Sequence, residues 1–335
     1  MTGSLPAYAI GAPVVSFAVA WVTVSVLLRT FAGRMLDHPN ERSLHQQPVP
    51  RTGGIGVATG IAVSVPLVSP IEWWPLWLGA ALLVGVSFVE DLAGLSIIGR
   101  LAAHFLAAGA LAAGLLAQGL EWGWAAVVIL PVVWMINLYN FMDGMDGLAG
   151  GMAVFGFGFL AVLSWVGDHQ PLMLVSASIA AAAAAFVLFN FHPARIFLGD
   201  AGSTTLGFLA AGLGLTGWHY GVWSLWVPLL VFSPFIVDAS VTLARRLMRG
   251  EKFWQAHRSH YYQRLVLSGW GHRKTASAAY GLMIICGLFA LTFQSASDGL
   301  RLVILAGAGA VFVVVGWVVM VVEQKAVGRD ALIGP

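Results

Sequence analysis

Residues 171–190 read PLMLVSASIAAAAAAFVLFN, a run without a single charged side chain. A helix of about 20 apolar residues is long enough to cross the hydrocarbon core of a bilayer. Similar runs recur along the whole chain, whose 335 residues are 59% hydrophobic and 10% charged, with a mean hydropathy of +0.84. The sequence therefore predicts an all-α polytopic membrane protein and excludes a soluble globular domain.

About eleven membrane-spanning helices are predicted, and they make residues 1–335 a single integral membrane domain. No small-residue cleavage site follows the first run, so this run is interpreted as a spanning helix and not as a signal peptide. The single cysteine, Cys286, excludes a disulfide framework. The predicted spans are residues 7–28, 53–70, 73–89, 101–118, 122–137, 148–166, 171–190, 203–217, 222–244, 276–294 and 300–322.

The distribution of basic residues predicts the orientation of the chain. Eleven spans put the two termini on opposite sides, and 16 of the 17 Lys and Arg residues then share the side of the C-terminus, with Arg301 on the other side. By the positive-inside rule this side is the cytoplasm, so the N-terminus is periplasmic. The unusual polar stretches, including a loop or interfacial arm at 245–275, all face the cytoplasm. An active site built from cytoplasmic loops is therefore expected.

The stretch NLYNFMDGMDGLAGG, residues 137–151, concentrates polar groups between two apolar runs. Asn137, Asn140, Asp143 and Asp146 recur at every third position, which places them on one face if the helix continues through them. Oxygen ligands at this spacing suit a hard cation such as Mg²⁺ or a polar ligand. Helix capping is the alternative, and it explains one aspartate but not four polar groups.

Two further acidic stretches are candidates. In IFLGDAGST, Asp200 stands just before an apolar run, as a helix N-cap, an oxygen ligand, or part of a helix N-terminus that receives phosphate. In VEDLAG, the adjacent carboxylates of Glu90 and Asp91 repel each other unless a cation or a donor lies between them. The alternative for this pair is two solvated loop acids.

Basic and imidazole side chains complete the candidate set. The stretch AHRSHYYQR holds His257, His260 and two arginines, the donors that hold phosphate oxygens around a metal. The alternative is a basic arm attracted to anionic lipid. His45 and Arg51 belong to LHQQPVPRTGG, which is otherwise an ordinary cytoplasmic loop. An acidic centre with a basic rim fits a polyanionic substrate such as a nucleoside diphosphate derivative. No P-loop occurs, and no nucleic-acid partner is expected.

These stretches, in this order, resemble the polyprenyl-phosphate N-acetylhexosamine-1-phosphate transferase superfamily, glycosyltransferase family 4. The resemblance implies transfer of a sugar-1-phosphate from a UDP-N-acetylhexosamine to undecaprenyl phosphate, with release of UMP and with Mg²⁺ or Mn²⁺, at the bacterial inner membrane. The HRSHYYQR form resembles the O-antigen-initiating branch. Gln46 stands where the peptidoglycan branch has a lysine, and Glu90 stands where the family usually has aspartate.

The residues and the resemblance together assign roles within the site. The expected metal ligands are Asp200 and Asn140. The expected catalytic residues are Glu90, Asp91, Asp143, Asp146, His257 and His260. The expected substrate-binding residues are His45, Arg51, Asn137, Asp143, Asp146, Phe197, Gly199, Arg258 and Arg264.

Several alternatives stay open at this level. The runner-up functions are phospho-N-acetylmuramoyl-pentapeptide transfer, cation transport, which predicts polar residues deep within several helices, and a non-catalytic scaffold. The sugar is not determined, nor is the choice between direct attack and a covalent aspartyl intermediate. Membrane lipid is an expected partner, and small-residue stretches such as LAGAGA fit internal helix packing or a homodimer.

Overall fold

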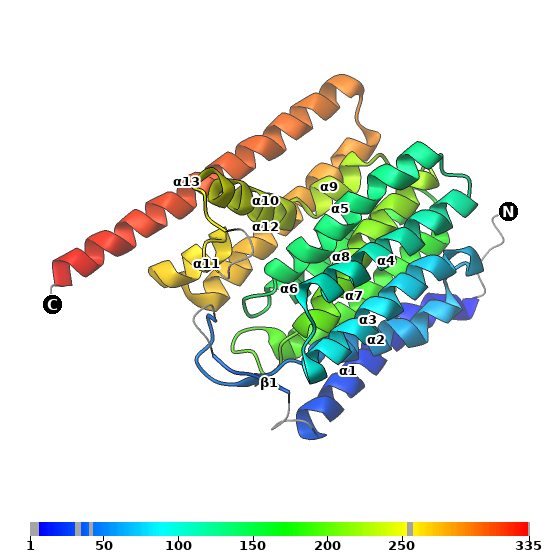
Figure 1. Cartoon of the computed structure of the whole chain (residues 1–335). Coiled ribbons are helices and arrows are strands. Elements are labelled where there is room, and N and C mark those ends of the chain that lie inside the picture. The colour runs from blue at the N-terminus through cyan, green and yellow to red at the C-terminus, as the bar shows by residue number, and fades with distance from the viewer. Residues whose placement is uncertain (1–6, 31–34, 40–42, 253–256, 334–335) are drawn as a thin grey trace.

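The computed structural model describes residues 7–30, 35–39, 43–252 and 257–333, without the side chains of residues 7–8, 91–93 and 328–333. The described chain is almost entirely helical, which confirms the all-α membrane class (Figure 1). Its elements are η1 (Ala7–Gly11), α1 (Ala12–Thr30), β1 (Leu36–Asp37), β2 (Val49–Pro50), α2 (Gly53–Ser64), η2 (Val65–Leu67), η3 (Ile71–Trp73), α3 (Trp74–Ala93), α4 (Ile97–Ala117), α5 (Trp122–Phe141), α6 (Leu148–Val166), α7 (Gln170–Asn190), α8 (Gly199–His219), α9 (Trp226–Val231), α10 (Ser233–Met248), α11 (Tyr261–Leu265), the π-helical turn η4 (Val266–Trp270), α12 (Gly271–Ser295) and α13 (Asp298–Ile333).

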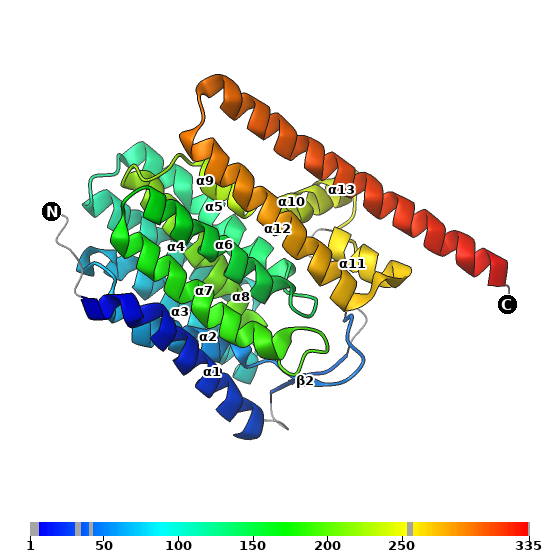
Figure 2. The ribbon, with the colours of Figure 1, turned by 180° about the vertical axis from the view of Figure 1, so that it is seen from behind.

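Helices α1 to α8 form a packed bundle. Helix α7 packs against α1 and α6, α8 packs against α3 and α5, and α12 covers α6 and α9. Helix α8 is buried along nearly its whole length. Because α8 faces other helices and not lipid, it carries glycine, serine and threonine where an outer helix carries large apolar side chains. Helix α13 lies at the edge of the bundle, apart from α1 to α8 (Figure 2).

All eleven predicted spans lie on helices, but these helices are not equally suited to cross a membrane. Within the described residues, eight helical segments are long and apolar enough to do so. The predicted spans 53–70, 203–217 and 222–244 are not among them. The eight segments are Ala9–Thr30, Ile71–Glu90, Ile97–Ala117, Trp122–Phe141, Leu148–Val166, Gln170–Asn190, Tyr261–Ser295 and Asp298–Val327.

The predicted ninth span is divided into α9 and α10. The backbone leaves the helical region at Phe232, where φ is −95° and ψ is 6°. Pro228 and Pro234 flank this point, and a proline removes a backbone donor from the helical ladder. The last helix, by contrast, is longer than predicted. The 36 residues of α13 extend over about 54 Å, more than the ~30 Å hydrocarbon core.

The polar connections gather at one end of the bundle. Strands β1 and β2 form an antiparallel hairpin in which Leu36 pairs with Pro50. This hairpin lies at the same end as the α5–α6 and α7–α8 connections and α11 (Figure 1). The expected loop or arm at 245–275 is largely helical in its described parts, because α10 continues to Met248 and α11, η4 and α12 occupy residues 261 onward.

Candidate functional site

Two glycine-containing stretches dock against each other to form the floor of the site. The Gly53 N–H donates to the Phe197 carbonyl at 2.9 Å, and the Gly54 N–H donates to the Leu198 carbonyl at 2.7 Å. In return, the Phe197 N–H donates to the Pro50 carbonyl at 2.7 Å. The structure therefore joins the PVPRTGG and IFLGD stretches, which are far apart in the sequence, through their backbones.

Gly199 is required by this docking. Its φ of +72° favours glycine, and a Cβ atom there would lie 2.4 Å from the carbonyl oxygen of Arg51. A side chain at this position would separate the two stretches. The structure thus supplies a packing reason for Gly199, beside the substrate-binding role expected from the sequence.

Asp200 and Asn140 lie together at the centre of the site. The Asn140 Nδ2 donates to Asp200 Oδ1 at 3.0 Å and to Ser203 Oγ at 2.9 Å. Asp200 is the second residue of α8, whose N-cap is Leu198 without a side-chain cap. Capping therefore does not account for Asp200. The two residues expected to bind a metal are in direct contact.

An arginine that the motif analysis did not select joins this centre. Arg100 Nη1 lies 2.9 Å from Glu90 Oε1 and 3.8 Å from Asp200 Oδ2. Arg100 thus supplies the donor that an acid pair requires. The side chain of Asp91, the other member of the expected acid pair, lies outside the described residues.

Asp143 adds a third carboxyl group to the centre. Burial and the neighbouring carboxylates of Asp200 and Asp37 hold the pKa of Asp143 well above its usual range, against a hydrogen bond from the Gly199 N–H. A carboxyl group whose pKa is raised by neighbouring carboxylates lies in a site with more negative charge than its protein donors neutralise. A bound cation reverses such a shift.

This donor set fits Mg²⁺. Asp143, Asp200 and Asn140 offer oxygen atoms, which are the ligands that hard divalent cations prefer. No cysteine is present here, and the histidines of the site belong to other networks described below. Asp200, Asn140 and Asp143 are therefore the residues that could hold such an ion.

Asp146 lies in a separate network. Its Oδ2 accepts from His192 Nδ1 at 2.7 Å and from the Ala194 N–H at 3.1 Å, and its Oδ1 lies 3.2 Å from His272 Nδ1. Burial would raise the pKa of Asp146, but the hydrogen bonds from His272, His192 and Ala194 outweigh burial and lower it. The carboxylate is buried and already bonded on both oxygens, so Asp146 holds neighbouring segments in place. It has fewer free lone pairs for a nucleotide than its motif suggests.

The same network reaches the hairpin segment and the α7–α8 connection. His272 Nε2 lies 3.3 Å from the Leu44 carbonyl oxygen. Asn190, which is buried, accepts from the Gly147 N–H at 2.9 Å and donates to the Ile196 carbonyl at 2.9 Å. The α5–α6 loop is therefore bonded to the α7–α8 connection through Gly147 and Asn190. It is also linked to the hairpin segment through Asp146 and His272.

His257 and His260, the histidines of the HRSH stretch, belong to a third group of contacts, apart from the Asp200 centre and the Asp146 network. His260 is buried, and its Nδ1 lies 3.2 Å from Asp238 Oδ1, which also accepts from the Tyr261 N–H at 2.9 Å. Asp238 therefore anchors the start of α11. The His257 ring centroid lies 4.9 Å from that of His260. Burial, followed by His260 and Arg246, lowers the pKa of His257 to about 4.

The remaining expected residues are more dispersed. The His45 ring lies edge-on to Phe197 with centroids 4.9 Å apart. Arg264 forms a two-point ion pair with Glu323. Asn137 donates to Val133 within its own helix. Arg51 follows the hairpin and Arg258 precedes α11, so both lie in the segments that frame the site.

Several residues of these networks were missed by motif analysis, namely Asp37, Arg100, His104, Asn190, His192 and His272. His104 Nδ1 lies 3.2 Å from Asn137 Nδ2. A weak signal existed for His192, which lies in FNFHPAR (residues 189–195) just before IFLGDAGST, and for Arg100, the basic residue nearest to Glu90 in the sequence. No signal in the sequence connected His272 with Asp146.

Comparison with known proteins supports the interpretation of this geometry. The family model for glycosyl transferase family 4 matches residues 73–217. A probable undecaprenyl-phosphate N-acetylglucosaminyl 1-phosphate transferase of Bacillus subtilis is 27% identical over 314 residues, covering 87% of this chain and 88% of the relative. An undecaprenyl-phosphate α-N-acetylglucosaminyl 1-phosphate transferase of Yersinia pestis is 27% identical over 285 residues, covering 77% and 76%. A phospho-N-acetylmuramoyl-pentapeptide-transferase of Thermosynechococcus vestitus is 27% identical over 331 residues, covering 84% and 83%.

A polytopic helical bundle with an acidic centre at one end, together with these matches, defines a class of membrane-embedded transferases. The chain is similar over most of its length to polyprenyl-phosphate N-acetylglucosamine-1-phosphate transferases, and its residues 73–217 match the family model. The resemblance drawn from the sequence motifs is thereby confirmed.

Proposed function

We propose that this protein transfers an N-acetylhexosamine-1-phosphate from a UDP-sugar to undecaprenyl phosphate and releases UMP. The observation that carries the proposal is the contact of Asn140 with Asp200 beside Asp143, at the end of a membrane bundle where basic residues also gather. The names of two relatives describe undecaprenyl-phosphate N-acetylglucosaminyl 1-phosphate transferases. A lipid acceptor and a nucleotide donor can meet only where the bundle reaches the membrane surface.

The reaction needs charge neutralisation more than it needs a strong base. An oxygen of the acceptor phosphate attacks the phosphorus that carries the sugar, and the bridging oxygen leaves with UMP. A phosphate monoester is already largely ionised near neutral pH, because its second pKa is about 6. The barrier is the approach of two anions, which positively charged and hydrogen-bonding groups lower by positioning and electrostatic stabilisation.

Mg²⁺ is part of this proposal, with Mn²⁺ as an alternative ion. Asp200, Asn140 and Asp143 would hold it, and the bound ion would offset the negative charge of the diphosphate. Arg100, which already contacts Glu90 and Asp200, keeps the acids oriented. His257 is neutral in the substrate-free protein because its pKa is low, so it donates a hydrogen bond to phosphate through its neutral ring until a nearby anion favours its charged form.

The site is proposed to face the cytoplasm of a bacterial inner membrane, with the N-terminus periplasmic. The distribution of Lys and Arg supports this orientation. The beginning of α1 and the end of α13 lie at opposite ends of the bundle (Figure 1), as an odd number of crossings requires.

The glycan pathway is proposed to be O-antigen or a related glycan. HRSHYYQR and Gln46 support this branch over the peptidoglycan branch. Phospho-N-acetylmuramoyl-pentapeptide transfer is the second candidate, because a relative that matches most of the chain carries that name. Cation transport is disfavoured, since the acids of the centre lie at one end of the bundle and not along a path through it.

The proposal is tested with purified protein, undecaprenyl phosphate and a panel of UDP-N-acetylhexosamines that includes UDP-N-acetylmuramoyl-pentapeptide. UMP release is measured with Mg²⁺, with Mn²⁺ and with a chelator. Metal-dependent UMP from one of the simple UDP-sugars is the expected result. Release from the pentapeptide donor alone would select the second candidate, and no metal-dependent UMP from any donor would exclude both.

A further inference from the structure

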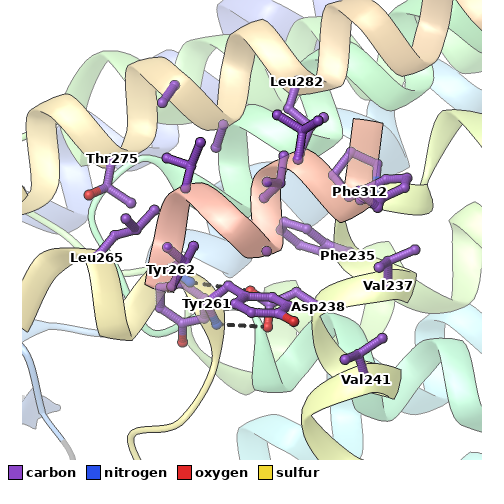
Figure 3. A pocket seen from close by; sticks show the side chains of 18 of the residues that line it. Phe235, Val237, Asp238, Val241, Tyr261, Tyr262, Leu265, Thr275, Leu282 and Phe312 are labelled. Carbon is purple, nitrogen blue, oxygen red and sulfur yellow. Dashed lines mark hydrogen bonds between the residues drawn. The ribbon is translucent and has the colours of Figure 1, made fainter. Parts of the chain in front are cut away.

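An apolar cavity of about 520 Å³ lies outside the site, between α10, α11, α12 and α13 (Figure 3). Val237 and Val241 form its α10 wall, Leu282 belongs to its α12 wall, and Phe312 belongs to its α13 wall. Cavities of this size hold small apolar ligands in other proteins. None of the proposed metal or phosphate contacts uses these side chains.

The length of the cavity matches one leaflet of a membrane. On α13 its lining extends from Gly309 to Met320, which corresponds to about 17 Å at the rise of an α-helix. Half of a hydrocarbon core is about 15 Å. An acyl chain of a membrane lipid therefore fits along the cavity, whereas a polyprenyl chain is much longer than one leaflet.

At the end of the cavity nearest to the site, Arg245, Tyr261 and Trp270 belong to the lining, and Lys274 contacts Trp270 without lining the cavity itself. The Arg245 guanidinium lies over the Tyr261 ring, 5.1 Å from its centroid, and the Lys274 ammonium lies over the Trp270 ring, 4.2 Å from its centroid. Among the residues that the structure describes, no carboxylate forms an ion pair with Arg245 or Lys274. Tyrosine and tryptophan are typical of the headgroup level, and basic pockets between helices bind anionic headgroups.

The polar groups of the wall are consistent with such a headgroup. Asp238 lines the cavity, but its carboxylate already accepts hydrogen bonds from the backbone of Tyr261 and Tyr262 (Figure 3). It also accepts one from His260. Thr275 also lines the cavity, is 2% exposed, and its hydroxyl has no hydrogen-bond partner among the described residues. A buried hydroxyl without a partner favours a polar ligand atom beside it.

We propose that this cavity binds an anionic glycerophospholipid from the leaflet on the side of the candidate site. One acyl chain lies between α10, α12 and α13, and the phosphate lies against Arg245. Because Met142 and Leu148 also line the cavity and flank the Asp143–Asp146 segment, a bound lipid supports the site from the membrane side. The binding itself does not depend on the transfer reaction.

Substitutions at glycines of α13 can fill the cavity without distorting the helix. A Cβ atom at Gly309 meets no atom within 4 Å, and one at Gly316 lies 3.6 Å from the nearest atom, Tyr261 Oη. Gly309→Leu and Gly316→Leu therefore place methyl groups in the space of the acyl chain. Gly299→Leu is the matched control, because it also lies in open space on α13 but outside the cavity.

Lipid retention is measured by native mass spectrometry of the detergent-purified full chain, after addition of phosphatidylglycerol or phosphatidylcholine. Wild type and Gly299→Leu are expected to retain phosphatidylglycerol preferentially, and the two cavity variants are expected to lose this retention. Arg245→Gln is expected to bind phosphatidylglycerol about fivefold more weakly, from the value of one basic residue near a lipid headgroup. Phosphatidylcholine retention should not change in Arg245→Gln.

Three results would overturn the proposal, and the first two concern the cavity directly. One is equal retention of phosphatidylglycerol by wild type and both cavity variants. Another is displacement of the lipid from wild type by undecaprenyl phosphate at equal concentration, which would assign the cavity to the acceptor of the transfer reaction. Loss of retention in Gly299→Leu together with the cavity variants would count equally against it.

Discussion

At the scale of single residues, the site depends on Asp200. Its carboxylate is the contact point of Asn140 and lies within reach of Arg100. It is the group that both the motif and the geometry place at the centre of the negative charge. Replacement of the Asp200 carboxylate should lower activity more than stability, because no helix cap depends on this side chain.

We expect Asp200→Asn to lower the turnover of UMP release by about two to three orders of magnitude, the usual effect of removing one electrostatic contact to a transition state. Turnover at saturating UDP-sugar is the measurement, with circular dichroism as the check on folding. Asp298→Asn is the matched control, because the Asp298 side chain is 98% exposed and distant in sequence from the centre. Near-normal turnover of Asp200→Asn would contradict the metal-site assignment.

His257 makes stability depend on pH. Its folded-state pKa is about 4, below the usual value of 6.5, so the folded protein binds fewer protons than the unfolded chain between these values. The free energy of unfolding should therefore fall as pH decreases from about 6.5 towards 4. The cause is the burial of an imidazole beside His260 and Arg246.

We expect His257→Gln to have a flatter dependence of melting temperature on pH than wild type over that window, measured in detergent by differential scanning fluorimetry. At pH 8, where both states hold a neutral His257, the mutation should cost only the hydrogen bonds that His257 makes with Ser259. Parallel curves for the two proteins between pH 6.5 and 4 would disprove the assignment of this effect to His257.

At the scale of elements, Asp146 joins the α5–α6 loop to the α7–α8 connection and to the start of α12. The bonds to His192, Ala194 and His272 cross between elements that do not follow one another in the chain. Through His272 the contact continues to Leu44 in the segment between β1 and β2. A defect at Asp146 should therefore loosen several site segments together.

We expect Asp146→Asn to destabilise the fold by about 1–3 kcal/mol, because an amide has a single oxygen and cannot accept from both imidazoles as the carboxylate does, so hydrogen bonds of a buried ionised group are lost. The measurement is the unfolding midpoint, together with protease sensitivity of the segment around Leu44. Asp168→Asn, at an exposed position in the α6–α7 turn, is the control. If Asp146→Asn lost activity with unchanged unfolding and proteolysis, Asp146 would instead act directly on substrate, as its motif suggests.

At the scale of the whole molecule, the orientation in the membrane decides on which side of the membrane the candidate site lies. The basic residues predict that the site end of the bundle is cytoplasmic and that the α12–α13 connection is periplasmic. The buried Cys286 can be removed as Cys286→Ser, which leaves a background for single-cysteine labelling.

In that background we expect Ser297→Cys to react with a membrane-impermeant thiol reagent in intact cells. Lys252→Cys should react only after the inner membrane is permeabilised. Both positions are exposed, so a difference in labelling reports sidedness and not burial. Labelling of Lys252→Cys in intact cells would invert the proposed topology.

The arrangement of helices in the whole molecule can be compared with the spans predicted from the sequence. The apolar runs sufficed for the helical class and for the positions of the helices, because a membrane span must satisfy its backbone within itself. The division of 222–244 into α9 and α10 was not predicted, although Pro228 and Pro234 were visible, because a hydropathy window averages over a short break. The full length of α13 was missed because its last turns leave the apolar pattern.

By itself, the sequence determined the helical membrane class and the likeness to the family, and it predicted the stretches of the candidate site, because these depend on local composition, spacing and order. Only the tertiary structure decided which partners the polar groups have. It placed Asn140 on Asp200, bound both oxygens of Asp146 to segments around it, and opened an apolar cavity beside α13. The physical reason is that a hydrogen bond or a cavity depends on distances across the fold, and residues far apart in the chain acquire these distances only when the helices pack.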